Sequence, residues 1–282
     1  MMPAPNRDDR TVEGFGEEWS RFDQSNVPEA ELEELFLAYF SPFPWSVLPR
    51  GAVGMDVGCG SGRWARFVAP RVGTLHCVDA SEKALGVARR TLSTLGNCVF
   101  HCASVDSIPV PDASLDFGYS LGVLHHVPDT AAAVAACVGK LKPGAPLLLY
   151  LYYSLDNRSL AYRLLWRTSD LGRRCISHLP IQGRLWISEG IAAAVYYPLA
   201  RLARLVELLG LEAGSLPLAF YRRRSFATMR TDAFDRFATR LEQRFSRTEI
   251  LHMMQVAGLE QIVFRDAAPY WCAVGRRSPL VR

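Results

Sequence analysis

The chain has 282 residues, of which 49% are hydrophobic, and a formal net charge of +4. A chain of this length and composition can bury one substantial core with an elaboration, which excludes a disordered protein. The longest uncharged stretches, residues 143–155 and 190–200, are shorter than the roughly 20 residues of a membrane-crossing helix. We therefore expect a soluble, cytoplasmic protein, either a monomer or a homodimer, with no transmembrane segment.

The seven cysteines are an odd number and show no CxxC spacing. Neither a zinc site nor a disulfide framework is indicated, and we predict no metal. Cys98 and Cys102 flank a strand that we expect to be buried, where a free thiol behaves as a small apolar group.

Residues 1–50 are polar at first and then carry a helical pattern over Glu29–Phe40. From residue 51 to 153, apolar runs alternate with helical stretches, which is typical of a parallel doubly wound sheet. The expected strands are Val53–Val57, Thr74–Asp79, Cys98–Ser104, Leu115–Leu121 and Ala145–Tyr152, and the expected helices are Trp64–Ala69, Ser81–Thr94 and Thr130–Leu141.

The turn after the first of these strands reads Asp56-Val57-Gly58-Cys59-Gly60-Ser61-Gly62. Alternating glycines allow a ligand to lie directly against the peptide groups between strand and helix. A dinucleotide fingerprint needs its third glycine at the position of Arg63, so NAD fits less well. Asp79 ends the next strand, where a carboxylate meets ribose hydroxyls in nucleotide-binding folds. The loop therefore indicates S-adenosylmethionine, although such turns also serve simple chain reversal.

With this loop, the stretch Ser104–Asp116 and the stretch Leu121–Asp129 (LGVLHHVPD), the chain resembles class I S-adenosylmethionine-dependent methyltransferases of the small-molecule branch. The resemblance implies a Rossmann-like α/β fold with a seven-stranded sheet and an antiparallel last strand. It also implies that S-adenosylmethionine is bound and S-adenosylhomocysteine released. The implied cofactor-binding residues are Asp56, Gly58, Gly60 and Gly62 for the methionine part, Asp79 for the ribose, Ser104 and Val105 for the adenine, and Leu121 for the cofactor's face. Cys59, inside the loop, and Ala80, next to Asp79, are further cofactor-binding candidates.

Two positions qualify this resemblance. The family usually has Asp where Ser104 stands, and a hydroxyl cannot offer the charged acceptor that a carboxylate does. The N-terminal segment, with Trp19 as a further cofactor-binding candidate, resembles a helical cap over the cofactor. Trp19 has an alternative role, which is to anchor the N-terminal helix to the core.

Residues 154–245 interrupt the alternation and are mostly helical by pattern, with Pro180 and Pro198 dividing them. Since this insertion follows the fifth strand, we expect a lid over the acceptor pocket; a peripheral bundle or a dimer interface is the alternative. One helix is expected to have an apolar face of Leu199, Leu202, Val206 and Leu209. Residues 246–282 resume with a helix at 248–256 and strands at 259–264 and 270–274, which complete the core sheet.

The positive charge is concentrated in the insertion, where residues 154–224 contain eleven arginines and five acidic residues. Such a segment is typical of a solvated surface, and a weak contact with a membrane surface is the alternative. No motif for methylation of nucleic-acid bases follows the fourth strand, so a nucleic acid ranks behind a small molecule as the partner.

The candidate catalytic residues lie after the fourth and fifth strands. His125 is placed to remove a proton from an acceptor, and Tyr153 to orient it. Each has an alternative role, since His125 can shape the cofactor pocket and Tyr153 can pack under the insertion. The prediction is a methyltransferase acting on oxygen, nitrogen or carbon of a small molecule, such as an apolar or aromatic biosynthetic product. A non-catalytic binding or protein-interaction module, an RNA methyltransferase and an oxidoreductase-type nucleotide binder remain as alternatives.

Overall fold

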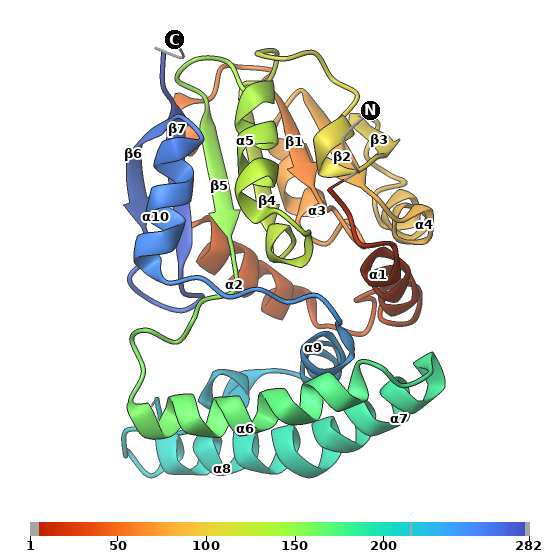
Figure 1. Ribbon diagram of the computed structural model, residues 1–282, viewed down its shortest axis with the longest axis vertical. Coiled ribbons are helices and arrows are strands. Elements are labelled where there is room, and N and C mark those ends of the chain that lie inside the picture. Colours follow the sequence, from red (N-terminus) through yellow and green to blue (C-terminus); the bar gives the residue numbers. More distant parts are fainter. Residues whose placement is uncertain (1–5, 215, 280–282) are drawn as a thin grey trace. The chain divides into compact units, whose positions relative to one another are not determined.

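A computed structural model describes residues 6–214 and 216–279 and divides into two compact units (Figure 1). The sheet unit comprises residues up to Ser20, residues 33–158 and residues from Leu241 onward. The helical unit comprises residues 21–32 and 159–240. The helical unit is thus shorter at both ends than the insertion predicted at 154–245, and it also takes in a piece of the N-terminal segment.

The sheet unit is built on seven strands in the order β3-β2-β1-β4-β5-β7-β6. Strands β1 to β5 are parallel, whereas β7 is antiparallel to both β5 and β6. This confirms the predicted fold class, a doubly wound sheet whose last strand is antiparallel. The strands are β1 Val53–Val57, β2 Thr74–Asp79, β3 Cys98–Cys102, β4 Phe117–Leu121, β5 Pro146–Tyr150, β6 Leu259–Phe264 and β7 Cys272–Arg277.

Side-chain caps fix where several helices of this unit begin. The hydroxyl of Ser81 accepts from the backbone N–H of Ala84, and the carboxylate of Asp129 accepts from that of Ala132. Ser246 begins the last helix with a reciprocal capping box to Glu249. The α-helices are α1 Asp9–Arg21, α2 Glu29–Phe40, α3 Ala65–Val68, α4 Glu82–Thr91, α5 Thr130–Lys140 and α10 Arg247–Val256, with 3₁₀ turns η1 Trp45–Val47, η2 Ala69–Arg71, η3 Val105–Ser107 and η4 Leu124–His126.

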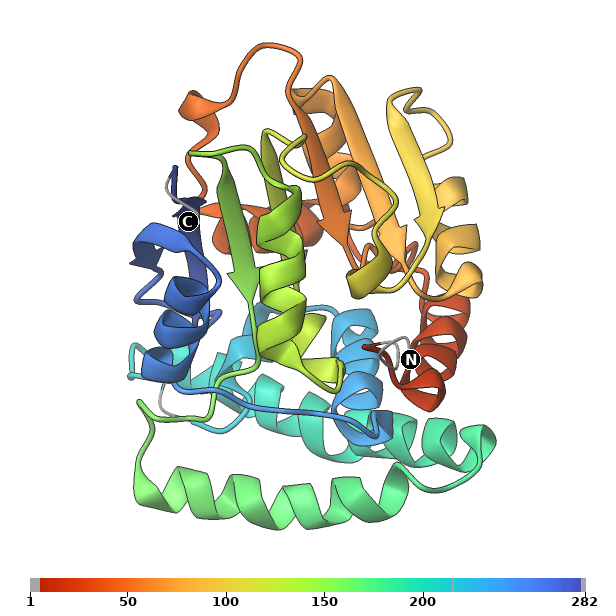
Figure 2. The same cartoon turned by 45° about the horizontal axis from the view of Figure 1, so that its top comes forward.

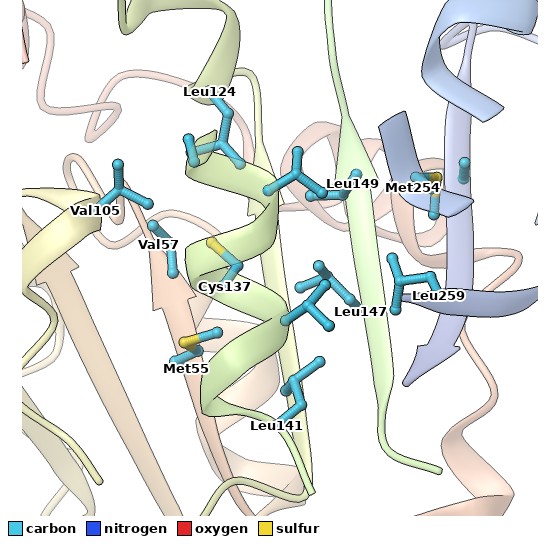
Figure 3. Close-up of a cluster of buried hydrophobic side chains, with 14 of the residues drawn as sticks. Met55, Val57, Val105, Leu124, Cys137, Leu141, Leu147, Leu149, Met254 and Leu259 are labelled. Carbon is cyan, nitrogen blue, oxygen red and sulfur yellow. The ribbon is translucent and has the colours of Figure 1, made fainter. Parts of the chain in front are cut away.

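The sheet has a hydrophobic core on each face. On the face turned to the viewer in Figure 1, α5 and α10 cover Met55, Leu147 and Leu149, as the side chains in Figure 3 show. On the other face, α2, α3 and α4 cover Leu75, Phe117 and their neighbours. Burial on both faces requires nearly continuous apolar strands, which explains why the strand runs could be identified from sequence.

One strand differs from the expectation. We expected the strand between Cys98 and Cys102 to be buried, but β3 is the edge of the sheet and the Cys102 side chain is exposed. An edge strand lacks a neighbour on one side, so its apolar residues are only partly covered. Sequence alternation cannot distinguish an edge from a centre because strand order is decided by tertiary pairing.

The helical unit contains α6 Leu160–Ile176, α7 Ile181–Ile191, the π-helix η5 Ala192–Tyr196, α8 Tyr197–Leu208, the 3₁₀ turn η6 Ala219–Arg223 and α9 Phe226–Ala238. Figure 2 shows α7, η5 and α8 as one continuous helix beside α6. Pro180 precedes α7 as expected, but Pro198 does not divide the segment. The wider π turn just before Pro198 accommodates a residue that has no N–H and needs space for its ring.

The apolar face predicted for α8 is not the buried side of this helix. Leu202 and Leu209 are 51% and 67% exposed, whereas Ala200 and Ala203 are fully buried. The small residues face the rest of the helical unit, since alanine allows close helix packing, and the leucines face outward. In the part of the chain that the structure describes, no helix is both long and apolar enough to span a membrane.

Candidate cofactor and acceptor site

The glycine loop after β1 has the conformation that its sequence requires. Gly58, Gly60 and Gly62 have φ angles of +76°, +54° and +78°, in the left-handed region that side chains rarely adopt. The backbone N–H groups of Gly58 and Cys59 donate to the carbonyl of Val78 at 2.7 and 3.0 Å, which ties the loop to β2. Cys59 is buried and its pKa is raised to about 11, so its thiol is not a nucleophile here.

Asp79 connects this loop to the end of β2. Its carboxylate accepts from the backbone N–H of Gly60 at 2.9 Å and from that of Ser81 at 2.8 Å. Burial raises the pKa of Asp79, and the two N–H donors oppose that rise. A carboxylate oxygen has more than one acceptor site, so both oxygens retain capacity for ribose hydroxyls. Ala80 follows directly, at the same edge of the sheet.

Asp56 has a different environment. Asp56 is 1% exposed, and its carboxyl group accepts a hydrogen bond from the hydroxyl of Tyr119, a β4 residue, at 2.9 Å. Burial raises the pKa of Asp56 to about 8, although the Tyr119 hydrogen bond opposes this. Tyr119 was missed from sequence because its partner lies 63 residues away.

Helix α1 crosses the carboxyl ends of three strands. A Cβ at Gly16 would lie 2.4 Å from the Ser81 hydroxyl, and one at Gly60 would lie 2.9 Å from the Trp19 indole. The Phe15 ring centroid lies 4.9 Å from that of His126, after β4. Trp19 therefore lies against the glycine loop, and its two predicted roles stay predictions.

The remaining implied cofactor contacts also gather at this edge. Val105 and Leu121 are buried beyond β3 and at the end of β4, respectively. The Ser104 hydroxyl is buried and has no hydrogen-bond partner among the described residues. Such a group is costly unless a ligand or water satisfies it. The glycine cradle, Asp79 and this hydroxyl together fit an adenosyl cofactor.

His125 lies within the 3₁₀ turn η4, which follows β4, and is fully buried. Its ring stacks on Tyr152, with centroids 3.8 Å apart, and its Nδ1 accepts from the Tyr152 backbone N–H at 3.4 Å. Burial lowers the pKa of His125 well below its usual value, and the charges of His126 and Arg244 act in the same direction. The imidazole is thus neutral, and with Nδ1 accepting, its proton resides on Nε2.

A segment far along the chain holds this histidine pair. The N–H of Gln243 donates to the carbonyl of His125 at 3.0 Å, and Nδ1 of His126 contacts the carbonyl of Leu241 at 2.6 Å. The Arg244 guanidinium lies 5.0 Å from the centre of the Tyr152 ring. No sequence signal marked residues 241–245, because their contacts lie about 90 residues or more away.

Tyr153 is not brought into contact with His125 by any of these interactions. Its hydroxyl accepts from Nε of Arg158 at 3.4 Å, and its ring lies 5.6 Å from that of Tyr270. The predicted role of Tyr153 in orienting an acceptor stays a prediction, as does the lid role of residues 154–245. Among residues 6–214 and 216–279, no cluster of His, Cys, Asp or Glu is arranged to hold a metal ion.

The Trp19–Gly60 contact gives a first test of the site. Replacing Gly60 by Ala adds a Cβ that strikes the indole and places alanine at a φ that costs roughly 1 kcal/mol or more. We expect about tenfold weaker S-adenosylmethionine binding by calorimetry. In a Trp19→Ala background the added Cβ no longer meets the indole. Adding Gly60→Ala there should therefore weaken S-adenosylmethionine binding only by the backbone cost. Unchanged binding in Gly60→Ala would contradict the proposed contact.

The sheet unit contains a class I S-adenosylmethionine-dependent methyltransferase domain, as its match to a family model shows. Residues 55–149 match the family model described as "Methyltransferase domain", which includes β1, the glycine loop, Asp79 and His125.

The chain is similar to curated proteins named ubiquinone biosynthesis O-methyltransferase. It is 36% identical to the one from Aromatoleum aromaticum over 107 residues, covering 37% of this chain and 44% of the relative. It is 33% identical to the one from Thiobacillus denitrificans over 164 residues, covering 57% and 65%, respectively. The matches thus span less than two thirds of these relatives.

A solved structure with the same fold comes from the complex between the Haloferax volcanii Trm112 methyltransferase activator and a methyltransferase. The TM-score is 0.53 at 14% identity, and the match covers 94% of this chain and 96% of that one. Identity this low concerns the fold alone.

Proposed function

We propose that this protein transfers the methyl group of S-adenosylmethionine to an oxygen of a small aromatic or apolar acceptor, and releases S-adenosylhomocysteine. The observation that carries the proposal is the hydrogen bond between Asp79 and the N–H of Gly60, which joins the ribose-binding carboxylate to the glycine cradle. A protein that had lost cofactor binding would have no reason to retain both.

When bound, the cofactor would supply an electrophilic methyl group on its sulfonium. Asp79 and Ala80 would hold the ribose, Ser104 and Val105 the adenine, and the backbone of Gly58–Gly62 the methionine part. Asp56, Cys59 and Leu121 would shape the walls, and Trp19 on α1 would exclude water from the loop. Positioning and exclusion of water account for much of the catalysis in such transfers.

The acceptor class rests on the relatives. The proteins from Aromatoleum aromaticum and Thiobacillus denitrificans are named O-methyltransferases of ubiquinone biosynthesis. The Tyr152 and Phe15 rings near the histidine pair offer aromatic contacts that favour a phenolic acceptor over a charged one. A catechol or hydroxylated quinol is therefore the first acceptor to test.

Two measurements test this function. Calorimetric titration should give micromolar affinity for S-adenosylmethionine and none for NADH. Transfer of labelled methyl to a panel of catechols, quinols, amines and RNA should label only phenolic oxygens. Binding without transfer to any acceptor would favour the non-catalytic binding module, and labelled RNA would favour the RNA methyltransferase.

We further propose that His125 acts as a hydrogen-bond donor through Nε2 and not as the base first expected. The basis is its Nδ1, which accepts from Tyr152, and the absence of any partner for its buried Nε2 among the described residues. Glutamine can keep a donor at that position but cannot take up a proton. We expect His125→Gln to retain kcat within about threefold, and His125→Ala to lose about tenfold, the usual size of one hydrogen bond.

The pH profile separates the two roles. If His125 donates a hydrogen bond, the pH dependence of kcat should be the same in His125→Gln and the unmodified protein. If His125→Gln is as inactive as His125→Ala, the histidine acts as a base and the donor role is wrong.

A further inference from the structure

Helix α6 has an exposed apolar stripe. Leu160, Leu164 and Leu171 are 82%, 63% and 63% exposed, and their spacing of four and seven residues places them on one side of the helix. The opposite side is buried through Asp170 and Arg173, and the Arg173 guanidinium donates to the carbonyl of Thr239 at 3.0 Å. The leucines are therefore turned away from the packing of their own unit.

Helix α8 repeats this arrangement. Leu202, Leu205 and Leu209 follow one side and are 51%, 53% and 67% exposed, while Ala200 and Ala203 on the other side are buried. On α7, Trp186 is 74% exposed. Exposed apolar side chains are common singly, but two leucine stripes and a tryptophan in one helical unit are more apolar surface than a monomeric protein usually leaves in water.

The sequence of this segment has a net positive charge. Residues 159–211 contain seven arginines, no lysine and three acidic residues. Each of the three acidic residues is already paired with arginine: Asp170 with Arg173 and Arg174, Glu189 with Arg230, and Glu207 with Arg204, Arg222 and Arg223.

Arginines also border the α6 stripe. Arg167 and Arg174 lie along the side of α6 next to the leucines and are both exposed. Long basic side chains can extend along an apolar surface and keep their charge in a polar layer. The apolar stripe thus has a cationic border, and Asp170, the single acidic residue in the sequence of this helix, is paired within the chain.

We propose that α6 and α8 form a docking surface for an anionic phospholipid membrane, with the leucines and Trp186 entering the interface and the arginines contacting lipid phosphates. Helices with an apolar side and a basic border bind in this way without crossing the bilayer. Tryptophan favours the same interfacial layer.

A second copy of the chain fits this surface less well. In a two-fold dimer the same patch faces itself, so arginines of one copy would oppose arginines of the other. Each acidic residue of 159–211 is paired with an arginine of its own chain, so an arginine outside these pairs, such as the exposed Arg167, would find no free carboxylate of this segment in the other copy. A layer of lipid phosphates offers the complementary charge.

Sedimentation with vesicles tests the proposal on the full chain. We expect binding to vesicles of phosphatidylglycerol and phosphatidylcholine, weaker binding to pure phosphatidylcholine, and release as sodium chloride rises from about 0.05 to about 0.5 M. The variants Leu164→Glu/Leu171→Glu and Leu205→Glu/Leu209→Glu should each reduce partitioning about tenfold or more. The matched control is Leu37→Glu/Val256→Glu, because these residues of α2 and α10 are also exposed, at 57% and 72%, and it should bind like the unmodified protein.

Circular dichroism and S-adenosylmethionine titration show whether each variant is folded, and neither should change. The proposal is overturned if the unmodified protein does not sediment with anionic vesicles, or if the control variant loses binding as much as the stripe variants. It is also overturned in favour of self-association if ultracentrifugation shows a dimer that the stripe variants convert to monomer.

Discussion

Replacing Asp79 by Asn should weaken S-adenosylmethionine binding about a hundredfold or more. The Asp79 carboxylate accepts from both the glycine loop and the start of α4, through Gly60 and Ser81. An amide can accept at one of these N–H groups but presents its own N–H₂ to the other, so one buried donor loses its partner. Each charge-assisted hydrogen bond contributes about 1.5–3 kcal/mol, and loss of a loop contact and a ribose contact together gives this effect.

Calorimetry with S-adenosylmethionine and S-adenosylhomocysteine checks this expectation. Asp112→Asn is the control, since this carboxylate pairs with Lys140 at the surface, and it should bind the cofactor normally. An Asp79→Asn protein that is folded by circular dichroism and binds with unchanged affinity would remove the main support for the proposed cofactor site.

Replacing Asp56 by Asn should make the stability of the protein less dependent on pH. The pKa of Asp56 is raised from 3.8 to about 8 in the folded state. Between these values the folded protein retains a proton that the unfolded chain releases, so stability falls as pH rises from about 4 to about 8. Each pH unit within that window changes the free energy of unfolding by roughly 1.4 kcal/mol for one such group.

Asparagine keeps an oxygen for the Tyr119 hydroxyl but does not titrate. Relative to the unmodified protein, Asp56→Asn should therefore gain about 2–4 kcal/mol of stability between about pH 5 and pH 8. Urea unfolding at both pH values measures this difference. A matched variant is Tyr119→Phe, which removes the hydrogen bond that lowers the Asp56 pKa, so the loss of stability should extend to higher pH. The same stability difference at both pH values would show that Asp56 is ionised in the fold.

If the Asp56 carboxylate contacts the methionine part, Asp56→Asn should weaken cofactor binding although it stabilises the fold. Such an exchange of stability against binding is typical of functional sites, where a buried ionisable group is retained at a cost.

The fold and the conformation of the glycine loop could be predicted from sequence because their determinants are local. Strands buried on both faces must be apolar along their whole length, and Gly58, Gly60 and Gly62 are needed where the backbone takes positive φ angles. Asp79 could be placed because the end of a strand fixes its side chain at the edge of the sheet.

Contacts between distant segments could not be predicted in this way. Tyr119 reaches Asp56 across 63 residues, and residues 241–245 hold the histidine pair from about 115 residues away. The exposure of the α8 leucines could not be predicted either, because helical periodicity shows that a face is apolar but not whether a partner covers it. Sequence by itself thus determined the class of fold and the turn of the glycine loop. The tertiary structure decided the environment of each ionisable group and the direction of each apolar face, since both depend on what packs against them.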